Sequence, residues 1–333
     1  MNYILLSLGV LIYIAIIADI IMTTLTVKGG GWLTGKISHW VWKLFLRISG
    51  NNGESTLLAH VGYLLLVLIA MIWVVMFNLS FILLLASDVD SVINSTTNLH
   101  VNLWEKIYYS GFVISTLGIG DFIASSNLWR SITILYSFTG LIFITMSITY
   151  FIPVLTAVIK KRKLGISLSS LGNTPQDIVL NALDADNSDY FKFQLLSLSD
   201  ALVEHSQNHR AYPVIHYFHN NKKDNTIILQ IARLNEAIHI LRMYVKKDRR
   251  PNKRQLTTME SALNNYVEVV MEVSGATFKK YNFDKMELNE LKAIGVVQEN
   301  VEKEEQDEMI QKRRTVLRTL VKEDGWDWAD VAS

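Results

Sequence analysis

The stretch TLGIGD, residues 116–121, lies between two long apolar segments, residues 57–86 and 129–159. Just before it, the run LWEKIYYS at residues 103–110 reads as a short helix. The two glycines of the stretch stand at alternate positions, and glycine adopts positive φ at little cost. Alternating backbone angles can point successive carbonyl oxygens in one direction, and such oxygens can replace the water around a dehydrated cation. The stretch therefore predicts a cation-binding loop between two membrane-length segments.

Residues 101–121 resemble the pore helix and selectivity filter of tetrameric potassium channels, whose filter is usually written T-V-G-Y-G-D. Residues 57–160 resemble the surrounding pore domain, with one pore loop in each chain. The resemblance implies a homotetramer that conducts potassium ions passively and needs no cofactor. The filter it implies consists of Thr116, Leu117, Gly118, Ile119, Gly120 and Asp121. The ions are expected at the carbonyl oxygens of Thr116, Leu117, Gly118 and Ile119, together with the Thr116 hydroxyl.

Two filter positions depart from the usual pattern. Leu117 replaces the usual valine, and Ile119 replaces the usual tyrosine, which in the family braces the filter against its surroundings. An aliphatic side chain at residue 119 leaves the carbonyl geometry possible without that brace. Potassium selectivity is therefore the leading hypothesis, and a weakly selective or non-selective cation channel is the alternative.

The composition changes along the 333-residue chain, because the first half is apolar and the second half is polar and charged. The formal net charge of +1 gives no indication of a nucleic-acid partner. Cysteine is absent from the sequence, which excludes disulfides, cysteine nucleophiles and thiolate metal sites.

Residues 1–31 form the predicted N-terminal transmembrane domain, in which residues 3–27 are long enough to cross a bilayer. We expect a helix that is retained, because no cleavage site is evident. Basic residues follow it, which places the N-terminus outside the cell membrane and the C-terminal domain in the cytoplasm. They are Lys28, Lys36, Lys43 and Arg47. Acids inside such a segment are often functional; for Asp19 we favour a carboxylate satisfied by water or by a neighbouring Lys, Ser or Thr.

Residues 32–50 form a predicted interfacial segment. Apolar side chains recur at helical spacing over residues 32–48 with basic side chains opposite them, so this helix is suited to lie among lipids on the cytoplasmic surface. Coupling to the gate and simple anchoring both stay open as its role.

Residues 51–163 form the predicted pore domain. Its outer helix, residues 57–86, contains one amide, Asn78, which we expect to hydrogen-bond to a neighbouring helix.

The inner helix is expected from Trp129 to about Ile159, ended by the basic run at residues 160–163. Gly140 is either a hinge or a site of close helix packing, and both interpretations stay open. Pro153 removes a backbone donor and should kink the helix. The resemblance implies gating roles for these two residues and cavity-lining positions for four others. The four are Leu141, Ile144, Ile148 and Ile152.

Residues 164–333 form the predicted cytoplasmic domain, with a role in regulation or assembly. Thr174-Pro175 marks a helix start, and residues 190–208, 225–247 and 252–274 carry apolar side chains at helical spacing. A Rossmann-type domain is not supported, because no G-x-G-x-x-G follows a strand pattern. The sequence thus predicts an all-α membrane protein, with a potassium-channel-like pore domain plus a helical cytoplasmic domain.

Five histidines gather between residues 205 and 239. His205 and His209 lie four apart on a predicted helix, a spacing that can bind a metal or sense protons; ordinary surface and core histidines are the simpler interpretation. Residues 164–333 show no recognisable nucleophile–base pair or phosphate-binding motif. A membrane-anchored enzyme or receptor is therefore the weaker alternative to a channel. The end of the chain, at residues 326–328, is expected to dock back onto the domain.

Overall fold

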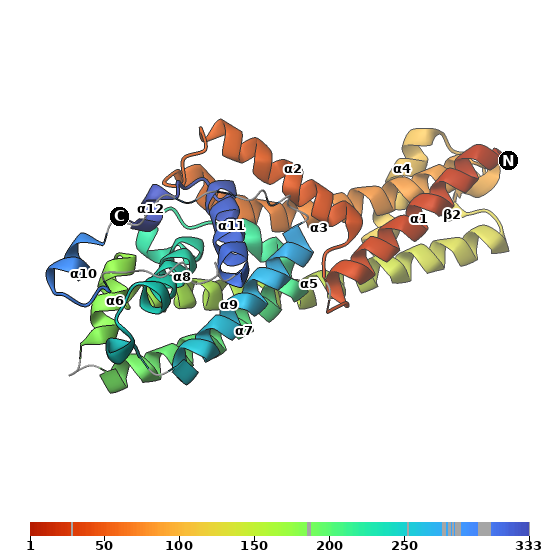
Figure 1. The fold of residues 1–333 in the computed structure, drawn as a ribbon. Coiled ribbons are helices and arrows are strands. Elements are labelled where there is room, and N and C mark those ends of the chain that lie inside the picture. The colour runs from red at the N-terminus through yellow and green to blue at the C-terminus, as the bar shows by residue number, and fades with distance from the viewer. Residues whose placement is uncertain are drawn as a thin grey trace. The chain divides into compact units, whose positions relative to one another are not determined.

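The computed structural model describes residues 1–27, 29–184, 188–251, 253–274, 278, 281, 283, 288–298 and 308–332. Helices make up nearly all of its regular structure, which confirms the predicted all-α class. Three helices are long and apolar enough to cross a membrane, namely α1 (Tyr3–Thr24), α3 (Thr56–Ala86) and α5 (Asn127–Ser169) (Figure 1). They correspond to the three segments predicted from the apolar runs. Lys28, one of the residues behind the predicted orientation, lies outside the described residues.

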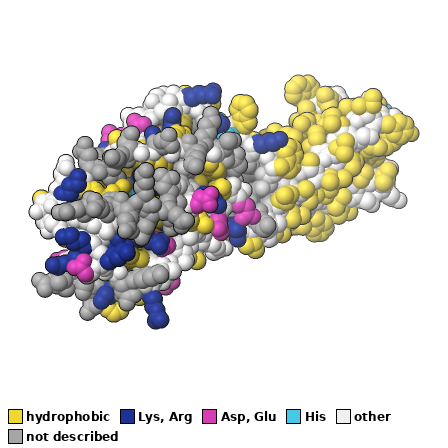
Figure 2. Space-filling model, in the orientation of Figure 1, with side chains coloured by type: hydrophobic (Ala, Val, Ile, Leu, Met, Phe, Trp, Pro, Cys, Tyr) yellow, Lys and Arg dark blue, Asp and Glu magenta, His cyan; other side chains and the backbone are white. Residues whose placement is uncertain are grey.

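The chain divides into two compact units. Unit 1 contains residues 1–37 and 64–154, and unit 2 contains residues 38–63 and 155–333. On the face shown in Figure 2, hydrophobic side chains cover most of unit 1, whereas charged side chains are spread over unit 2. An apolar surface of this kind suits a lipid environment. The two compact units are divided within α2, α3 and α5. The domain boundaries predicted from the sequence, at residues 31, 50 and 163, stay a prediction.

Unit 1 also holds the first turns of α2 (Trp32–Ile48), the short helix α4 (Leu103–Ile114) and the 3-10 turn η1 (Val89–Ser91). A small antiparallel sheet pairs β1 (Val92–Asn94) with β2 (Phe122–Ala124). The sequence analysis did not predict this sheet, because three-residue strands are too short to show alternation. β2 follows TLGIGD directly, so the sheet fixes the end of that loop.

Polar contacts between helices hold unit 1 together. The Ser80 hydroxyl of α3 lies 2.9 Å from the Gly9 carbonyl of α1 and 2.6 Å from the Tyr136 hydroxyl of α5. The ring of Tyr136 stacks on Phe81 with centroids 4.3 Å apart. A Cβ added at Gly9 would lie 2.9 Å from the Ser80 carbonyl oxygen, so a glycine is required at this crossing. Small residues and hydroxyls at such crossings let helices pack closely in a membrane.

Asp19 in α1 is fully buried and has a structural role, as we favoured from the sequence. Its carboxylate accepts hydrogen bonds from the Leu33 amide at 2.8 Å and the Thr34 hydroxyl at 2.6 Å, at the start of α2. The Trp73 indole of α3 donates a further bond at 3.1 Å. An anion at a helix N-terminus is stabilised by the free amides and the helix dipole. Asp19 therefore caps α2 and joins three helices.

The predicted end of the inner helix is wrong. The basic run at residues 160–163 does not terminate α5, which continues for ten residues beyond Ile159, to Ser169, with Pro153 inside it. Leu164 and Leu168, one helical turn apart, are buried in the core of unit 2. Burial of these leucines explains why the helix continues past the charged run. A kink at Pro153 stays a prediction.

Unit 2 is built from the remaining helices. The longer ones confirm the predicted segments: α7 (Ser188–Ala211), α8 (Ile227–Met243) and α9 (Lys253–Ser274). The helix predicted at Thr174-Pro175 is α6 (Pro175–Leu183), with a capping box between Thr174 and Asp177. The other elements are η2 (Pro213–Tyr217), η3 (Lys223–Asn225), η4 (Lys247–Arg249), α10 (Asn289–Ala293), α11 (Glu308–Glu323) and α12 (Ala329–Ala332).

Helix α8 runs through the middle of unit 2 and is buried from Ile227 to Leu241. It contacts α6, α11 and α12, while α7 packs along α9. Trp326 is also buried and lies against Gly53, at the turn between α2 and α3, so the predicted docking of the chain end is confirmed. The Gly53 amide donates to the Gly325 carbonyl at 2.7 Å. Residues 38–63 are thus an integral part of unit 2.

Candidate functional site

The start of α4 is fixed by its own cap and by a buried lysine. Asn102 and Glu105 form a capping box, with the Asn102 side chain accepting from the Glu105 amide at 3.1 Å and the Glu105 carboxylate accepting from the Asn102 amide at 2.7 Å. Lys106 is 4% exposed and donates to the carbonyl oxygens of Leu85 at 2.9 Å and Asp88 at 2.6 Å. These carbonyls lie at the end of α3, so Lys106 ties the start of α4 to it.

Two side-chain hydrogen bonds hold the middle of α4. Ser110 donates to the Asn78 side chain of α3 at 2.9 Å, which confirms the predicted interhelical role of Asn78. The Tyr109 and Thr133 hydroxyls lie 2.9 Å apart and join α4 to α5. Helix α4 is therefore wedged between the two long helices of unit 1, which sets the direction in which its C-terminus points.

The C-terminal end of α4 packs closely on Gly140. A Cβ added at Gly140 would lie 2.6 Å from the Ile114 carbonyl oxygen, closer than any side chain tolerates. Of the two interpretations left open for Gly140, this contact favours close packing. The glycine lets α5 approach the last turn of α4, immediately before TLGIGD.

The TLGIGD backbone alternates as the glycine spacing predicts. Thr116, Gly118 and Gly120 have φ values of +59°, +59° and +87°, whereas Leu117 and Ile119 between them do not have positive φ. Such alternation turns successive amides to one side of the chain and successive carbonyls to the other. Positive φ at Thr116 could not be predicted from the sequence, because a β-branched residue rarely adopts this conformation.

The two ends of the loop are anchored while its middle is open. The Leu117 amide donates to the Phe112 carbonyl at 2.9 Å, and the Ser95 amide donates to the Asp121 carbonyl at 2.9 Å. The Asp121 carboxylate also makes a side-chain hydrogen bond with Tyr108 of α4. Leu117 is 67% exposed and Ile119 is 49% exposed. The loop is therefore held at both ends and exposed over residues 116–120, a geometry suited to binding dehydrated cations with its carbonyls.

Comparisons with known proteins agree with this geometry. The family model described as "Ion channel" matches residues 63–157, which contain most of α3, all of α4 and the TLGIGD loop, and the first part of α5. The chain is also 33% identical over 263 residues to the uncharacterized membrane protein YdjJ of Bacillus subtilis strain 168, covering 79% of this chain and 76% of that one. The chain belongs to the pore-loop ion channel family. No solved structure matches this channel.

The four residues predicted to line the cavity of the channel share one exposed face of α5. Leu141, Ile144, Ile148 and Ile152 are between 49% and 63% exposed. Their spacing of three and four residues places them in one row along the helix. Exposure of an apolar row is compatible with a cavity wall and with other surroundings, so the cavity role stays a prediction.

The predicted sensor residues of the channel lie in unit 2. His205 and His209 are each 3% exposed on α7, with ring centroids 6.1 Å apart. The ring centroid of His216, in η2, lies 5.6 Å from that of His209. We call His205, His209 and His216 the histidine cluster. In the part of the chain that the structure describes, no group of three or more His, Asp or Glu side chains is placed to hold a metal ion. The metal interpretation of His205 and His209 therefore gains no support.

Proposed function

We propose that the protein is a subunit of a potassium channel, which conducts potassium ions passively through a homotetrameric pore in the cell membrane. The observation that carries this proposal is the alternation of positive φ at Thr116, Gly118 and Gly120 in an exposed loop. Stacked rings of backbone carbonyls that replace the hydration shell are the chemistry of potassium filters. One chain presents its carbonyls from one side only, so a complete cage requires several copies, and one pore loop per chain implies four.

The permeant potassium ions are the ligands in this proposal, and no other cofactor is required. They are coordinated by the carbonyls of Thr116, Leu117, Gly118 and Ile119. The row from Leu141 to Ile152 on α5 lines the cavity below them and closes it by dewetting. The N-terminus lies outside and residues 164–333 lie in the cytoplasm, as the basic residues after α1 and at residues 160–163 favour. In this proposal, residues 164–333 shift the balance between the open and closed pore through α5, which carries the row from Leu141 to Ile152.

Ile119 favours a second candidate, a cation channel that also passes sodium. Its aliphatic side chain is half exposed and has no polar atom with which to brace the loop, in contrast to the tyrosine usual at this position. The carbonyl rings then hold their diameter less firmly, and discrimination between potassium and sodium falls. A membrane-anchored enzyme is disfavoured, because the ion channel family points to a protein that is not an enzyme.

The test is ion flux through the purified protein in liposomes, with sodium substituted for potassium. Gly118→Ala is the decisive variant, because a Cβ at residue 118 meets nothing within 4 Å, so only the positive φ opposes it. That conformation costs an L-residue about 1–2 kcal/mol, enough to turn a carbonyl out of the row. Gly35→Ala is the matched control, since its Cβ also meets nothing within 4 Å and its φ is not positive.

Potassium-selective flux that Gly118→Ala abolishes and Gly35→Ala preserves would support the proposal. Equal flux of sodium and potassium would favour the non-selective channel. Flux that is unchanged by Gly118→Ala would contradict a pore formed by this loop.

A further inference from the structure

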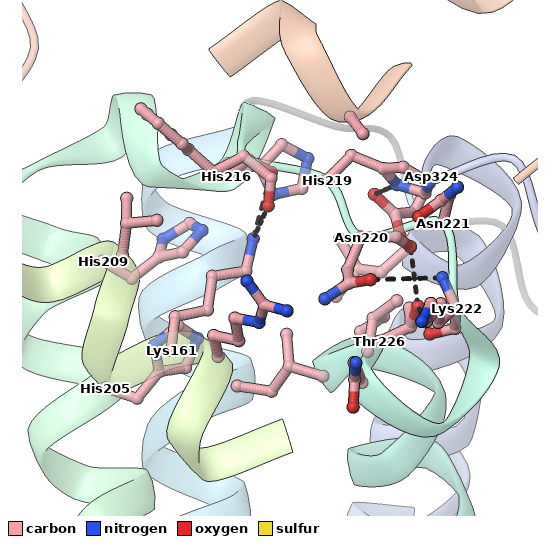
Figure 3. A pocket seen from close by; sticks show the side chains of 18 of the residues that line it. Lys161, His205, His209, His216, His219, Asn220, Asn221, Lys222, Thr226 and Asp324 are labelled. Atoms are coloured by element: carbon pink, nitrogen blue, oxygen red, sulfur yellow. Dashed lines mark hydrogen bonds and ion pairs between the residues drawn. The ribbon is translucent and has the colours of Figure 1, made fainter. Parts of the chain in front are cut away.

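A cavity of about 220 Å³ lies within unit 2, outside the pore loop. Its walls come from the end of α5, from α7, and from the segment that joins η2 to α8 (Figure 3). Polar and charged side chains dominate the labelled part of this wall, including His205, His209, Asn220 and Asn221. Nothing in the proposed conduction mechanism uses them, and so the cavity needs a separate explanation.

The cavity carries an excess of positive charge. Lys161, Arg162 and Lys222 all line it. Asp324 is the one lining carboxylate among the described residues, and it is already paired with His219 at 3.1 Å. Burial lowers the pKa of His219, but the Asp324 carboxylate outweighs burial and raises it, so Asp324 is engaged by His219. Arg162 and Lys222 form no ion pair with any other described residue. An anion in the cavity would balance these charges.

Two buried imidazoles on the wall have ring nitrogens without a hydrogen-bond partner among the described residues. Both ring nitrogens of His209 and the Nδ1 of His205 are unpartnered among the described residues, although each side chain is at least nine-tenths buried. Burial, and after it neighbouring charges, lowers the pKa of His205 to about 3 and that of His209 well below its usual value. Each ring is thus neutral, with one N–H donor to offer. Buried polar atoms usually have hydrogen-bond partners, so these ring nitrogens are available to a polar ligand.

The N-terminus of α8 opens on the same cavity. Thr226 occupies the N-cap position but does not cap the helix; its hydroxyl lies 2.8 Å from both the Asn220 and the Lys222 carbonyl oxygens and shares its one proton with them. Ile227 and Ile228, the first residues of this 17-residue helix, line the wall. Free amides and the helix dipole at such a terminus favour an anion, and phosphate above all.

We propose that this cavity binds a small phosphate-bearing anion. A phosphate offers several acceptor oxygens at once, matching an arginine, a lysine, side-chain amides, imidazole N–H groups and helix amides on one wall. The volume of about 220 Å³ is many times that of one water but below the usual range of drug-sized sites. Inorganic phosphate or a compact phosphomonoester therefore fits, and a dinucleotide does not.

Lys161 and Arg162 link this site to α5, the predicted inner helix. Both residues belong to α5, and Lys161 donates to the Ile215 and Phe218 carbonyls, each at 2.9 Å, which fixes the segment beside the cavity to the helix. A bound anion that draws Arg162 toward the α8 terminus acts directly on α5. Regulation of flux by this route rests on the proposed channel function, whereas binding does not.

Binding is tested by thermal unfolding of the full-length protein in a phosphate-free maltoside detergent. Inorganic phosphate and glycerol 3-phosphate are titrated separately, with chloride at matched ionic strength. Arg162→Gln combined with Lys222→Gln removes two exposed cations of the wall that make no structural bond with other described residues. Lys163→Gln is the control, because it removes an exposed neighbouring cation that does not line the cavity.

We expect a saturable rise in unfolding temperature with at least one of the two phosphates, and the probe that gives it identifies the source. The double variant should bind at least about tenfold more weakly, since it loses two charge-assisted hydrogen bonds to the phosphate. Lys163→Gln should bind as the unchanged protein does. The proposal would be overturned if neither phosphate raised the unfolding temperature. It would also be overturned if the double variant showed the same rise as the unchanged protein.

Flux measurements separate this proposal from that of the channel. In liposomes, the phosphate that binds should change potassium flux by about fivefold or more from the side of unit 2, and the double variant should lose this response. Absence of flux under every condition counts against the channel, and leaves the binding result intact. Normal potassium flux without any phosphate binding counts against the proposed phosphate site in the cavity.

Discussion

Gly140→Ala is expected to destabilise the protein through a contact with the pore helix. The added methyl lies 2.6 Å from the Ile114 carbonyl oxygen, and an ordinary contact begins at 3.4 Å, so α5 and α4 must separate by about 0.8 Å. The obstructing atom is backbone, which cannot rotate away as a side chain can. Overpacking of this kind costs about 1–3 kcal/mol. Alanine returns about 1 kcal/mol of helix propensity, which leaves a net loss of up to about 2 kcal/mol.

The same displacement reaches the TLGIGD loop, because Ile114 lies two residues before Thr116. We therefore expect Gly140→Ala to lower both the apparent unfolding temperature and the ratio of potassium to sodium flux. Gly35→Ala is the control, and should raise the unfolding temperature slightly, since its methyl meets nothing within 4 Å and a helical glycine is replaced.

A hinge at Gly140 makes the opposite prediction. Under that interpretation alanine stiffens α5, so total flux falls while stability and selectivity are retained or improve. A Gly140→Ala protein that gains as much thermal stability as Gly35→Ala, with unchanged selectivity, would refute the packing argument.

Three further outcomes follow from buried polar groups. Asp19→Ala should lower stability by at least about 2 kcal/mol in thermal unfolding, because it leaves several buried donors unpaired; an unchanged unfolding temperature would contradict its capping role. Glu236→Gln should cost about 3–5 kcal/mol, since the buried Arg314 guanidinium, 2.9 Å away, loses its counter-charge; a loss below about 1 kcal/mol in denaturant titration would show that the pair is not desolvated. Acidification from pH 6.5 to 5 should destabilise unit 2, because the histidine cluster has lowered pKa values when folded and binds protons only on unfolding, at up to about 1.4 kcal/mol per pH unit for each histidine. His219, with its raised pKa, works in the opposite sense only above pH 6.5, where its stabilisation is lost as the pH rises. Unfolding that is independent of pH between 7 and 5 would contradict the prediction.

The sequence predicted the membrane helices and the order of the pore elements well, because long apolar runs and a glycine-spaced loop are strong local signals. Asn78 and Asp19 were also interpreted correctly, since a lone polar group in an apolar helix must find a partner. Their actual partners, Ser110 for the amide and the start of α2 for the carboxylate, depend on how helices cross. Such crossings leave no periodic trace in the chain.

The errors arose where distant residues decide local structure. The basic run at residues 160–163 reads as a helix end, yet α5 continues because leucines beyond it are buried in unit 2. The cavity in unit 2 was not predicted, since its wall joins α5, α7 and α8 from three separate parts of the chain. Positive φ at Thr116 was missed for a related reason: it occurs in a loop that is anchored to α4 and to residue 95, and these contacts leave no trace in the sequence.

The burial of Trp326 against Gly53 has a consequence for biosynthesis. The nearby bond from the Trp42 indole to the Glu323 carbonyl joins residues 281 positions apart, so α2 leaves the ribosome long before its partners exist. At about 5–20 residues per second, the wait is about 15–60 s. During that interval the apolar side of α2 has only the membrane surface or a chaperone to cover it. Translation speed and the cellular machinery that meets the nascent chain therefore act on this protein at helix α2.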